Sequence, residues 1–177
     1  MLSHPTKTSR EGWSLGEPCA KFAFMGLKEL LAQAMNRPQK KAGDGQRDPL
    51  EDPGLLALVF HPRKDPSPPR QDFLARDVLF RVCPEVEIGA RFYPSGQGFP
   101  NLIFFHGNGE IASDYDEIAR LFVERGLNLL VVDYRGYGQS SGTPTLRDML
   151  QDALELVDPI CQWLAGQGFG GVRWVMG

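Results

Sequence analysis

The sequence predicts an α/β fold in which an antiparallel hairpin is followed by a βαβαβ parallel sheet. Three apolar segments carry this prediction, at residues 102–105, 129–132 and 172–176. Each runs into a glycine-bearing loop, and helix-length segments separate them, which is typical of parallel strands. Upstream, two segments of alternating apolar and polar residues flank a short turn at 83–85, as in a hairpin. We expect right-handed crossovers between the parallel strands.

Length and composition fit one domain and exclude several classes of function. The chain has 177 residues, 42% of them hydrophobic, which is enough to bury a core. The net charge is -3 and the basic residues are scattered, so we expect no nucleic-acid partner. No apolar run reaches the ~18 residues of a transmembrane segment, and no signal peptide is recognisable. The cysteines form no CxxC pair, and no metal site is predicted. We expect a cytoplasmic protein.

Residues 1–54 are expected to be a leader that need not be ordered, and we assign it no function. Residues 21–35 carry apolar side chains at helical spacing and predict an amphipathic helix on the edge of the domain. Residues 36–54 are rich in proline, glycine and charge and predict a linker. The domain itself is then expected to span residues 55–177.

The first part of the domain predicts a hairpin with one buried face. It is preceded by a short apolar segment at 55–60 and an irregular segment at 61–70 that contains four prolines. Arg91 and Tyr93 alternate with the apolar residues and are expected on the opposite face. The residues expected on the buried face are Val78, Phe80, Val82, Val86, Ile88, Ala90 and Phe92.

The first helix of the βαβαβ unit is predicted after residue 112. Ser113 and Asp116 have the spacing of a capping box, and Gly126 is expected to end the helix. The buried stripe is expected to consist of Ile118, Leu121 and Phe122.

The second helix is predicted to have Thr143 as its cap and Pro144 at its first position. Pro159 is expected to kink or end it, because proline lacks the N–H that an interior position needs. The apolar residues at helical spacing are Leu146, Leu150, Leu154, Val157 and Leu164.

The loop after residues 102–105 reads His106-Gly107-Asn108-Gly109-Glu110. It lies at the carboxyl end of a predicted strand, where open α/β sheets bind ligands. Acyl transfer needs backbone N–H donors aimed at a developing oxyanion, and such a loop can supply them. We expect the Asn108 N–H to be the oxyanion donor of this loop, with the Gly109 N–H as the second choice and with His106 and Gly107 shaping the loop. A tight turn without a catalytic role is the plainer interpretation.

A dinucleotide-binding module is a competing interpretation of the same loop. Gly107, Gly109 and Ala112 match the GxGxxG/A fingerprint, and Asp133 ends the next strand, where a ribose-binding acid would lie. Against it, a hairpin precedes the motif and the helix is predicted to begin beyond it. Asp133 also follows Gly107 by 26 residues rather than about 20. We therefore predict no cofactor.

The loop after residues 129–132 is the most specific string in the chain, Asp133-Tyr134-Arg135-Gly136-Tyr137-Gly138-Gln139-Ser140-Ser141-Gly142. This D-Y-R-G-Y-G loop, the H-G-N-G loop before it and V-M-G at the end of the next strand together resemble the α/β-hydrolase family. The similar branch is that of bacterial serine hydrolases of the serine-aminopeptidase-like and lysophospholipase-like kind. The resemblance covers about residues 72–177.

The resemblance implies a serine hydrolase that cleaves a small-molecule carboxylic ester or amide through an acyl-enzyme. It also implies an architectural role for the second loop. Asp133 and Arg135 would brace loops near the site, and Gly136 and Gly138 would permit a tight backbone.

The resemblance further implies that the nucleophile lies outside the chain. Gly177 matches the first glycine of a Gly-x-Ser-x-Gly elbow, so the serine is expected two residues beyond it, and the acid and histidine later still. The histidines at 4, 61 and 106 all precede the elbow. Ser140 has G-x-S-x-G spacing between Gly138 and Gly142, but it follows a loop rather than a strand, so neither it nor Ser141 is the expected nucleophile.

We therefore expect an N-terminal fragment of a serine hydrolase, with an incomplete α/β-hydrolase fold and no catalytic residue, inactive by itself. A second consequence is an unprotected apolar sheet edge at 172–176, which is expected to self-associate. A non-enzymatic interaction fragment that uses this edge is thus the alternative function.

Overall fold

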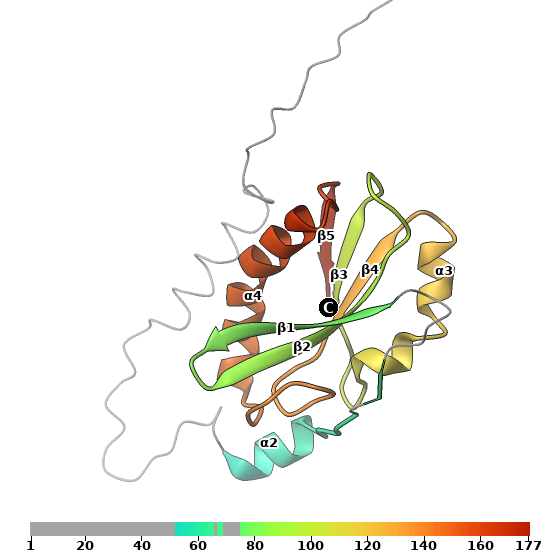
Figure 1. Cartoon of the computed structure of the whole chain (residues 1–177). Helices are drawn as coiled ribbons and strands as arrows, with labels where there is room; N and C mark the ends of the chain where they lie inside the picture. Colours follow the sequence, from blue (N-terminus) through green and yellow to red (C-terminus); the bar gives the residue numbers. More distant parts are fainter. Residues whose placement is uncertain (1–51, 66, 69–74) are drawn as a thin grey trace, which may run out of the picture.

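The computed structural model describes residues 52–65, 67–68 and 75–177 (Figure 1). The predicted leader helix at 21–35 lies outside the described residues. In chain order the elements are α2 (Pro53–Val59), β1 (Arg76–Cys83), β2 (Val86–Tyr93), β3 (Asn101–Phe105), the 3₁₀ turn η3 (Ala112–Tyr115), α3 (Ala119–Val123), β4 (Asn128–Val132), α4 (Leu146–Gly166) and β5 (Arg173–Met176).

The strands form one mixed sheet in the order β1-β2-β4-β3-β5. β1 and β2 pair antiparallel, with a register shift between Arg81 and Cys83, and β2 pairs antiparallel with β4. β3 lies parallel to both β4 and β5. The predicted α/β fold class, an antiparallel hairpin followed by a βαβαβ parallel sheet, is thereby confirmed.

Helices cover both faces of the sheet, with α4 on one side and α3 on the other (Figure 1). Residues alternate between the two faces along β4, where Leu130 and Val132 pack in the α4 cluster and Leu129 and Val131 in the other. From α4, the residues that pack in the first cluster are Leu156, Val157, Ile160, Cys161 and Leu164. The sheet core is therefore a central layer buried from both sides, as burial of parallel strands requires.

The prediction of one buried face holds for β1 and is wrong for β2. In β1, Phe80 is buried while Leu79 is 50% exposed. In β2, Arg91 and Tyr93 on the second face are buried as well. The reason is position, because β2 lies between β1 and β4 and the η3 turn covers its second face.

The predicted first helix is divided into η3 and α3. The carboxylate of Asp114 accepts a hydrogen bond from the Ile111 N–H at 3.0 Å, so the turn begins before Ser113. The break shifts the helical phase, and Ile118 and Leu121 are exposed rather than buried, while Ala119 is buried in their place. Gly126 ends the helix as predicted, with a φ of 74°.

The second helix begins later than predicted. The cap of α4 is Thr145, not Thr143, and its hydroxyl accepts a hydrogen bond from the Asp148 N–H at 3.0 Å. Pro159 lies inside the helix and does not end it. Of the apolar residues at helical spacing, Leu164 is buried and Leu150 is 37% exposed.

The apolar segment at 55–60 forms α2, which begins at the cap residue Asp52 with Pro53 in the first turn. Its residues Leu56 and Val59 pack with Phe60, Ile111 and Tyr137. This contact holds α2 against the loops that follow β3 and β4. No helix within the described residues combines the length and the apolar character that crossing a membrane requires.

Candidate active site

The predicted site residues meet where β3, β4 and β5 end. Phe105 is paired with Val132, so the loops that begin at His106 and Asp133 leave the sheet side by side. On the other side of β3, Met176 is paired with Phe104. Gly177 packs against Phe105 so closely that a Cβ on it would lie 3.0 Å from the Phe105 Cβ. The three motifs that were predicted separately thus lie together at the carboxyl ends of these strands.

The loop after β3 is a tight turn closed by Glu110. The Gly107 N–H donates to Glu110 Oε2 at 2.8 Å, and the Glu110 N–H donates to the Gly107 carbonyl at 3.2 Å. The Tyr115 hydroxyl also donates to Oε2, at 2.6 Å. These bonds, that from Tyr115 above all, lower the pKa of Glu110. The carboxylate therefore stays ionised and holds the turn.

Two N–H groups of this loop have no partner among the described residues. The Ile111 N–H is taken by Asp114, and the Ala112 N–H donates to Asp133 Oδ1 at 2.8 Å. Within the part of the chain that the structure describes, neither the Asn108 N–H nor the Gly109 N–H has a hydrogen-bond partner. These are the two groups predicted to be the oxyanion donors, and they lie on a partly exposed turn.

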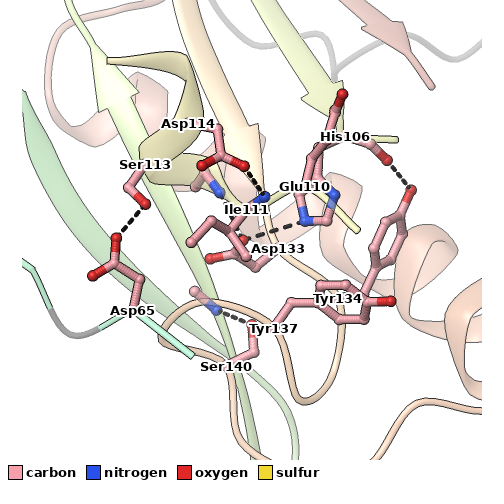
Figure 2. A network of polar contacts seen from close by, with 12 residues as sticks. Asp65, His106, Glu110, Ile111, Ser113, Asp114, Asp133, Tyr134, Tyr137 and Ser140 are labelled. Atoms are coloured by element: carbon pink, nitrogen blue, oxygen red, sulfur yellow. Dashed lines mark hydrogen bonds and ion pairs between the residues drawn. The ribbon is translucent and has the colours of Figure 1, made fainter. Parts of the chain in front are cut away.

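His106 is buried behind this turn. Its Nδ1 lies 2.9 Å from the Gly107 carbonyl oxygen, and its Nε2 lies 3.2 Å from Asp133 Oδ1 without the alignment of a good hydrogen bond (Figure 2). The ring of Tyr134 packs edge-on against the imidazole, with centroids 4.7 Å apart. A buried imidazole held on three sides is placed to shape the loop rather than to meet a substrate.

Asp133 points into the protein. It is 3% exposed, and its own N–H donates to the Gly89 carbonyl of β2 at 2.9 Å. Gly138 passes so close that a Cβ on it would lie 2.1 Å from Asp133 Oδ2, and its φ of 44° also favours glycine. An inward carboxylate is not placed to bind a ribose. The Gly107–Ala112 motif runs into the four-residue turn η3 rather than directly into a long helix, so the geometry does not favour the dinucleotide interpretation.

Arg135 joins the second loop to α4. Its guanidinium makes a bidentate contact with Asp152, at 2.6 and 2.8 Å, and a further ion pair with Asp148 at 3.1 Å. The hydrogen bonds from Arg135 to Asp152 raise the pKa of the guanidinium. The next residue, Gly136, has a φ of 78°, a conformation that favours glycine.

The serines of the second loop are engaged in structural contacts. Ser140 is buried, and its Oγ accepts a hydrogen bond from the Gly89 N–H at 2.9 Å. Ser141 Oγ accepts one from the Glu87 N–H at 2.9 Å. The loop thus binds the backbone of β2, and Ser140 has none of the exposure that a nucleophile at an elbow needs.

Two tyrosines and an arginine contact the first loop without having been predicted from the sequence. The Tyr134 hydroxyl donates to the His106 carbonyl at 3.0 Å (Figure 2). The Tyr137 hydroxyl accepts from the His61 N–H at 2.7 Å and lies 3.4 Å from Asn108 Oδ1. Arg63 Nε donates to the Gly109 carbonyl at 3.3 Å. The aromatic residues on both sides of Gly136 were the only signal in the sequence.

Comparison with known proteins finds one hydrolase family model and several relatives. A family model described as serine aminopeptidase, S33, matches residues 99–172. An uncharacterized protein of Mycobacterium tuberculosis is 31% identical over 114 residues, which are 62% of this chain and 39% of that protein. Human protein ABHD12B is 28% identical over 130 residues, which are 67% of this chain and 33% of that protein. The chain therefore spans no more than about two fifths of the length of these relatives.

Among solved structures, an esterase of Pyrococcus furiosus, Pf2001, superimposes with a TM-score of 0.49 at 18% sequence identity. The superposition covers 66% of this chain and 47% of that one.

Proposed function

Since the chain belongs to the α/β-hydrolase family, we propose that it forms the N-terminal part of a serine hydrolase acting on carboxylic esters or amides. In that reaction a serine attacks the carbonyl carbon, the alcohol or amine leaves, and water releases the acid from the acyl-enzyme. Backbone N–H groups stabilise the oxyanion that forms in each step. The chemistry needs no cofactor.

The free N–H groups of Asn108 and Gly109 carry this proposal. Both donors lie on an exposed or partly exposed turn at the carboxyl end of the sheet, where open α/β sheets bind ligands, so a substrate oxygen can reach them. Donors of this kind contribute ~10²–10³-fold to the turnover rate of acyl-transfer enzymes. The proposed donor of this loop is therefore the Asn108 N–H, with the Gly109 N–H as the second candidate, and the other donor of the oxyanion hole is proposed to be the N–H after the serine.

The nucleophile is proposed to follow Gly177 by two residues. Gly177 packs on Phe105, the residue before the His106 loop. The backbone that follows Gly177 would therefore lie next to the N–H groups of Asn108 and Gly109. Within the described residues, Ser140 and Ser141 are engaged with β2 and His106 is buried. The relatives are more than twice as long as the matched segment, which leaves room for a serine, an acid and a histidine. Residues 1–177 alone are then expected to be inactive.

A fluorophosphonate probe tests the proposal, because it labels only an activated serine. The full-length protein should label, and alanine in place of the serine two residues after Gly177 should abolish the label. Ser140→Ala is the matched control and should label like wild type if it folds. Residues 1–177 alone should not label. Labelling of that shorter chain, lost on Ser140→Ala, would place the nucleophile in the second loop and overturn the assignment.

Association through β5 is a second candidate function, supported by a different observation. Within the described part of the chain β5 pairs on one side only, with β3, and Val172, Trp174, Val175 and Met176 are each at least 40% exposed. An apolar strand with an open edge is a template for another strand. We propose that residues 1–177 alone self-associate there.

A further inference from the structure

We infer that Glu110 is a positioning residue that decides which backbone N–H groups of the His106 loop stay free for the substrate oxygen. This inference rests on the proposed function, since it concerns the proposed oxyanion hole. Glu110 itself is not expected to contact the reacting atoms. Its role is to occupy the Gly107 N–H and so to fix the orientation of the two peptide groups that follow.

The pattern of occupied and free donors along the loop supports this role. Of the six N–H groups from 107 to 112, four have partners, whereas those of Asn108 and Gly109 have none among the residues that the structure describes. Glu110 makes two hydrogen bonds with Gly107, the residue just before the two unpaired groups. Its side chain accepts from the Gly107 N–H, and its own N–H donates to the Gly107 carbonyl. The bond from the Gly107 N–H to the side chain three residues on corresponds to one half of a capping box, and the backbone bond closes a turn. It leaves only the middle of the turn unpaired.

The Glu110 carboxylate is itself held in place. Tyr115 donates to the same oxygen, Oε2, that accepts from Gly107. The Tyr115 ring packs on Phe104 of β3, with centroids 5.2 Å apart, and belongs to the core cluster of that face. A side chain anchored in the sheet core therefore orients the carboxylate, and the carboxylate orients the turn. Glycine suits position 107, because a Cβ there would lie 3.2 Å from Glu110 Oε2 and would crowd the carboxylate.

The charge of Glu110 distinguishes positioning from electrostatic catalysis. A carboxylate close to a developing oxyanion opposes it, so a carboxylate has no electrostatic benefit at this position. A neutral glutamine has an oxygen that accepts the same hydrogen bond from Gly107. If Glu110 acts by geometry, Glu110→Gln should keep the function and Glu110→Ala should lose it.

The kinetic test uses the full-length protein and an activated ester. Glu110→Ala is expected to lower kcat by about 10–100-fold with KM changed by less than about threefold, because misplaced donors act in the transition state. Glu110→Gln is expected to retain kcat within about threefold. Glu124→Ala removes an exposed carboxylate paired with Arg120 and serves as the control. An unchanged kcat in Glu110→Ala, or equal losses in the alanine and glutamine variants, would overturn the inference.

A second measurement does not depend on catalysis. In protein labelled with ¹⁵N-glycine, Gly107 and Gly109 report the occupied and the free donor of the same turn. The chemical shift of the Gly107 amide proton should change with pH as Glu110 titrates. The hydrogen exchange of this amide should be at least about tenfold slower than that of Gly109. Glu110→Ala should abolish both the titration and the protection. Tyr115→Phe should move the titration to higher pH, because the Tyr115 hydrogen bond contributes most to the lowered pKa of Glu110.

The two failures are separable. If wild-type full-length protein does not label with the fluorophosphonate, the proposed function fails, and with it the role of Glu110 toward a substrate. If the wild type labels but Gly107 neither titrates nor is protected, the inference on Glu110 fails and the proposed function stands.

Discussion

The carboxylate of Asp133 accepts a hydrogen bond from the backbone N–H of Ala112 at 2.8 Å, and this bond joins the end of β4 to the turn that follows the His106 loop. The Asp133 N–H donates to Gly89 in the middle of β2. Asp133, at the end of β4, is thus hydrogen-bonded both to β2 and to the turn after the candidate oxyanion loop. The motif that begins with Asp133 thus contacts the turn after the candidate loop from its buried side, and the architectural role expected for this motif stays a prediction.

Removing this carboxylate should destabilise the protein. Asp133→Ala leaves the buried Ala112 N–H without a partner, and we expect a loss of about 1–3 kcal/mol in the free energy of unfolding. Asp133→Asn keeps an oxygen acceptor and should lose less. Urea unfolding at neutral pH measures both. Equal losses in the two variants would show that the Ala112 bond is not the reason for them.

Gly138→Ala should be among the most damaging small substitutions in the chain. The added Cβ would lie 2.1 Å from Asp133 Oδ2, at a φ of 44°. Gly98 is the matched control, since its φ is 87° but nothing lies within 4 Å of an added Cβ. Gly98→Ala should cost about 1–2 kcal/mol for the backbone alone. Gly138→Ala should cost more in the same urea experiment or prevent folding. A cost no greater than that of Gly98→Ala would contradict the close approach.

The buried cation Arg91 should contribute far more than the exposed Arg81 in the same hairpin. Arg91 donates to Asp77 at 2.7 Å and to Asp116 at 3.0 Å, and its side chain is 3% exposed. Burial alone would lower the pKa of Arg91, but the hydrogen bonds to Asp77 and Asp116 raise it. Arg91→Ala leaves two half-buried carboxylates without their cation and should cost about 3–5 kcal/mol.

Arg81→Ala is the control for that change. Arg81 pairs with Glu87 at 2.9 Å, and both side chains are exposed. Its loss should cost at most about 1 kcal/mol. Thermal or urea unfolding measures the stability of both variants. Equal losses of stability in Arg91→Ala and Arg81→Ala would contradict the burial of Arg91.

Asp65 should remain ionised to unusually low pH. A hydrogen bond from the Ser113 hydroxyl, with further bonds from Ser67, lowers its pKa from 3.8 to about 2. Because the folded value lies below the unfolded one, its contribution to stability is complete above about pH 4 and is lost as the pH falls through about 2. Carboxyl ¹³C titration should give this midpoint, and Ser113→Ala should raise it. A wild-type midpoint near 4 would contradict the contact.

The open edge of β5 should make residues 1–177 associate. Sedimentation velocity should show a concentration-dependent dimer or larger species, and Val175→Lys should shift the distribution toward monomer, because a charge on an edge strand opposes pairing. Leu121→Lys, at an exposed apolar position of α3, is the control and should leave the distribution unchanged. A monomer that unfolds cooperatively at all concentrations would remove the second candidate function.

Much of the fold could be predicted because the signals are local. Alternation along 78–82 and 86–92 gave the hairpin, and the apolar strands before His106 and Asp133 gave the parallel pair. The predictions were wrong where contacts with residues distant in the sequence determine whether a side chain is buried. Arg91 is buried because Asp77 and Asp116 meet it from 14 and 25 residues away, which alternation cannot indicate. Ile118 is exposed because Asp114 starts a separate turn and shifts the helical phase.

The candidate site was predicted in outline for a similar reason. The glycines of the His106 loop indicate a turn, but a sequence does not reveal which N–H groups the turn leaves free. That depends on Glu110, Asp114 and Asp133 each taking one of them. The i to i+3 spacing of Gly107 and Glu110 was the one local signal of this arrangement. Tyr134 and Tyr137 lie near His106 only because β3 and β4 are adjacent.

The place of β3 between β4 and β5 has a consequence for biosynthesis. β3 leaves the ribosome before either of its neighbours, and the finished hairpin gives it no partner, because β2 pairs with β4. At elongation rates of about 5–20 residues per second, this apolar strand waits one to several seconds with both edges unpaired. Nascent chains stalled at lengths where residue 105 has emerged from the ribosome and residue 128 has not should therefore be the ones that chaperones of the ribosome exit bind most strongly.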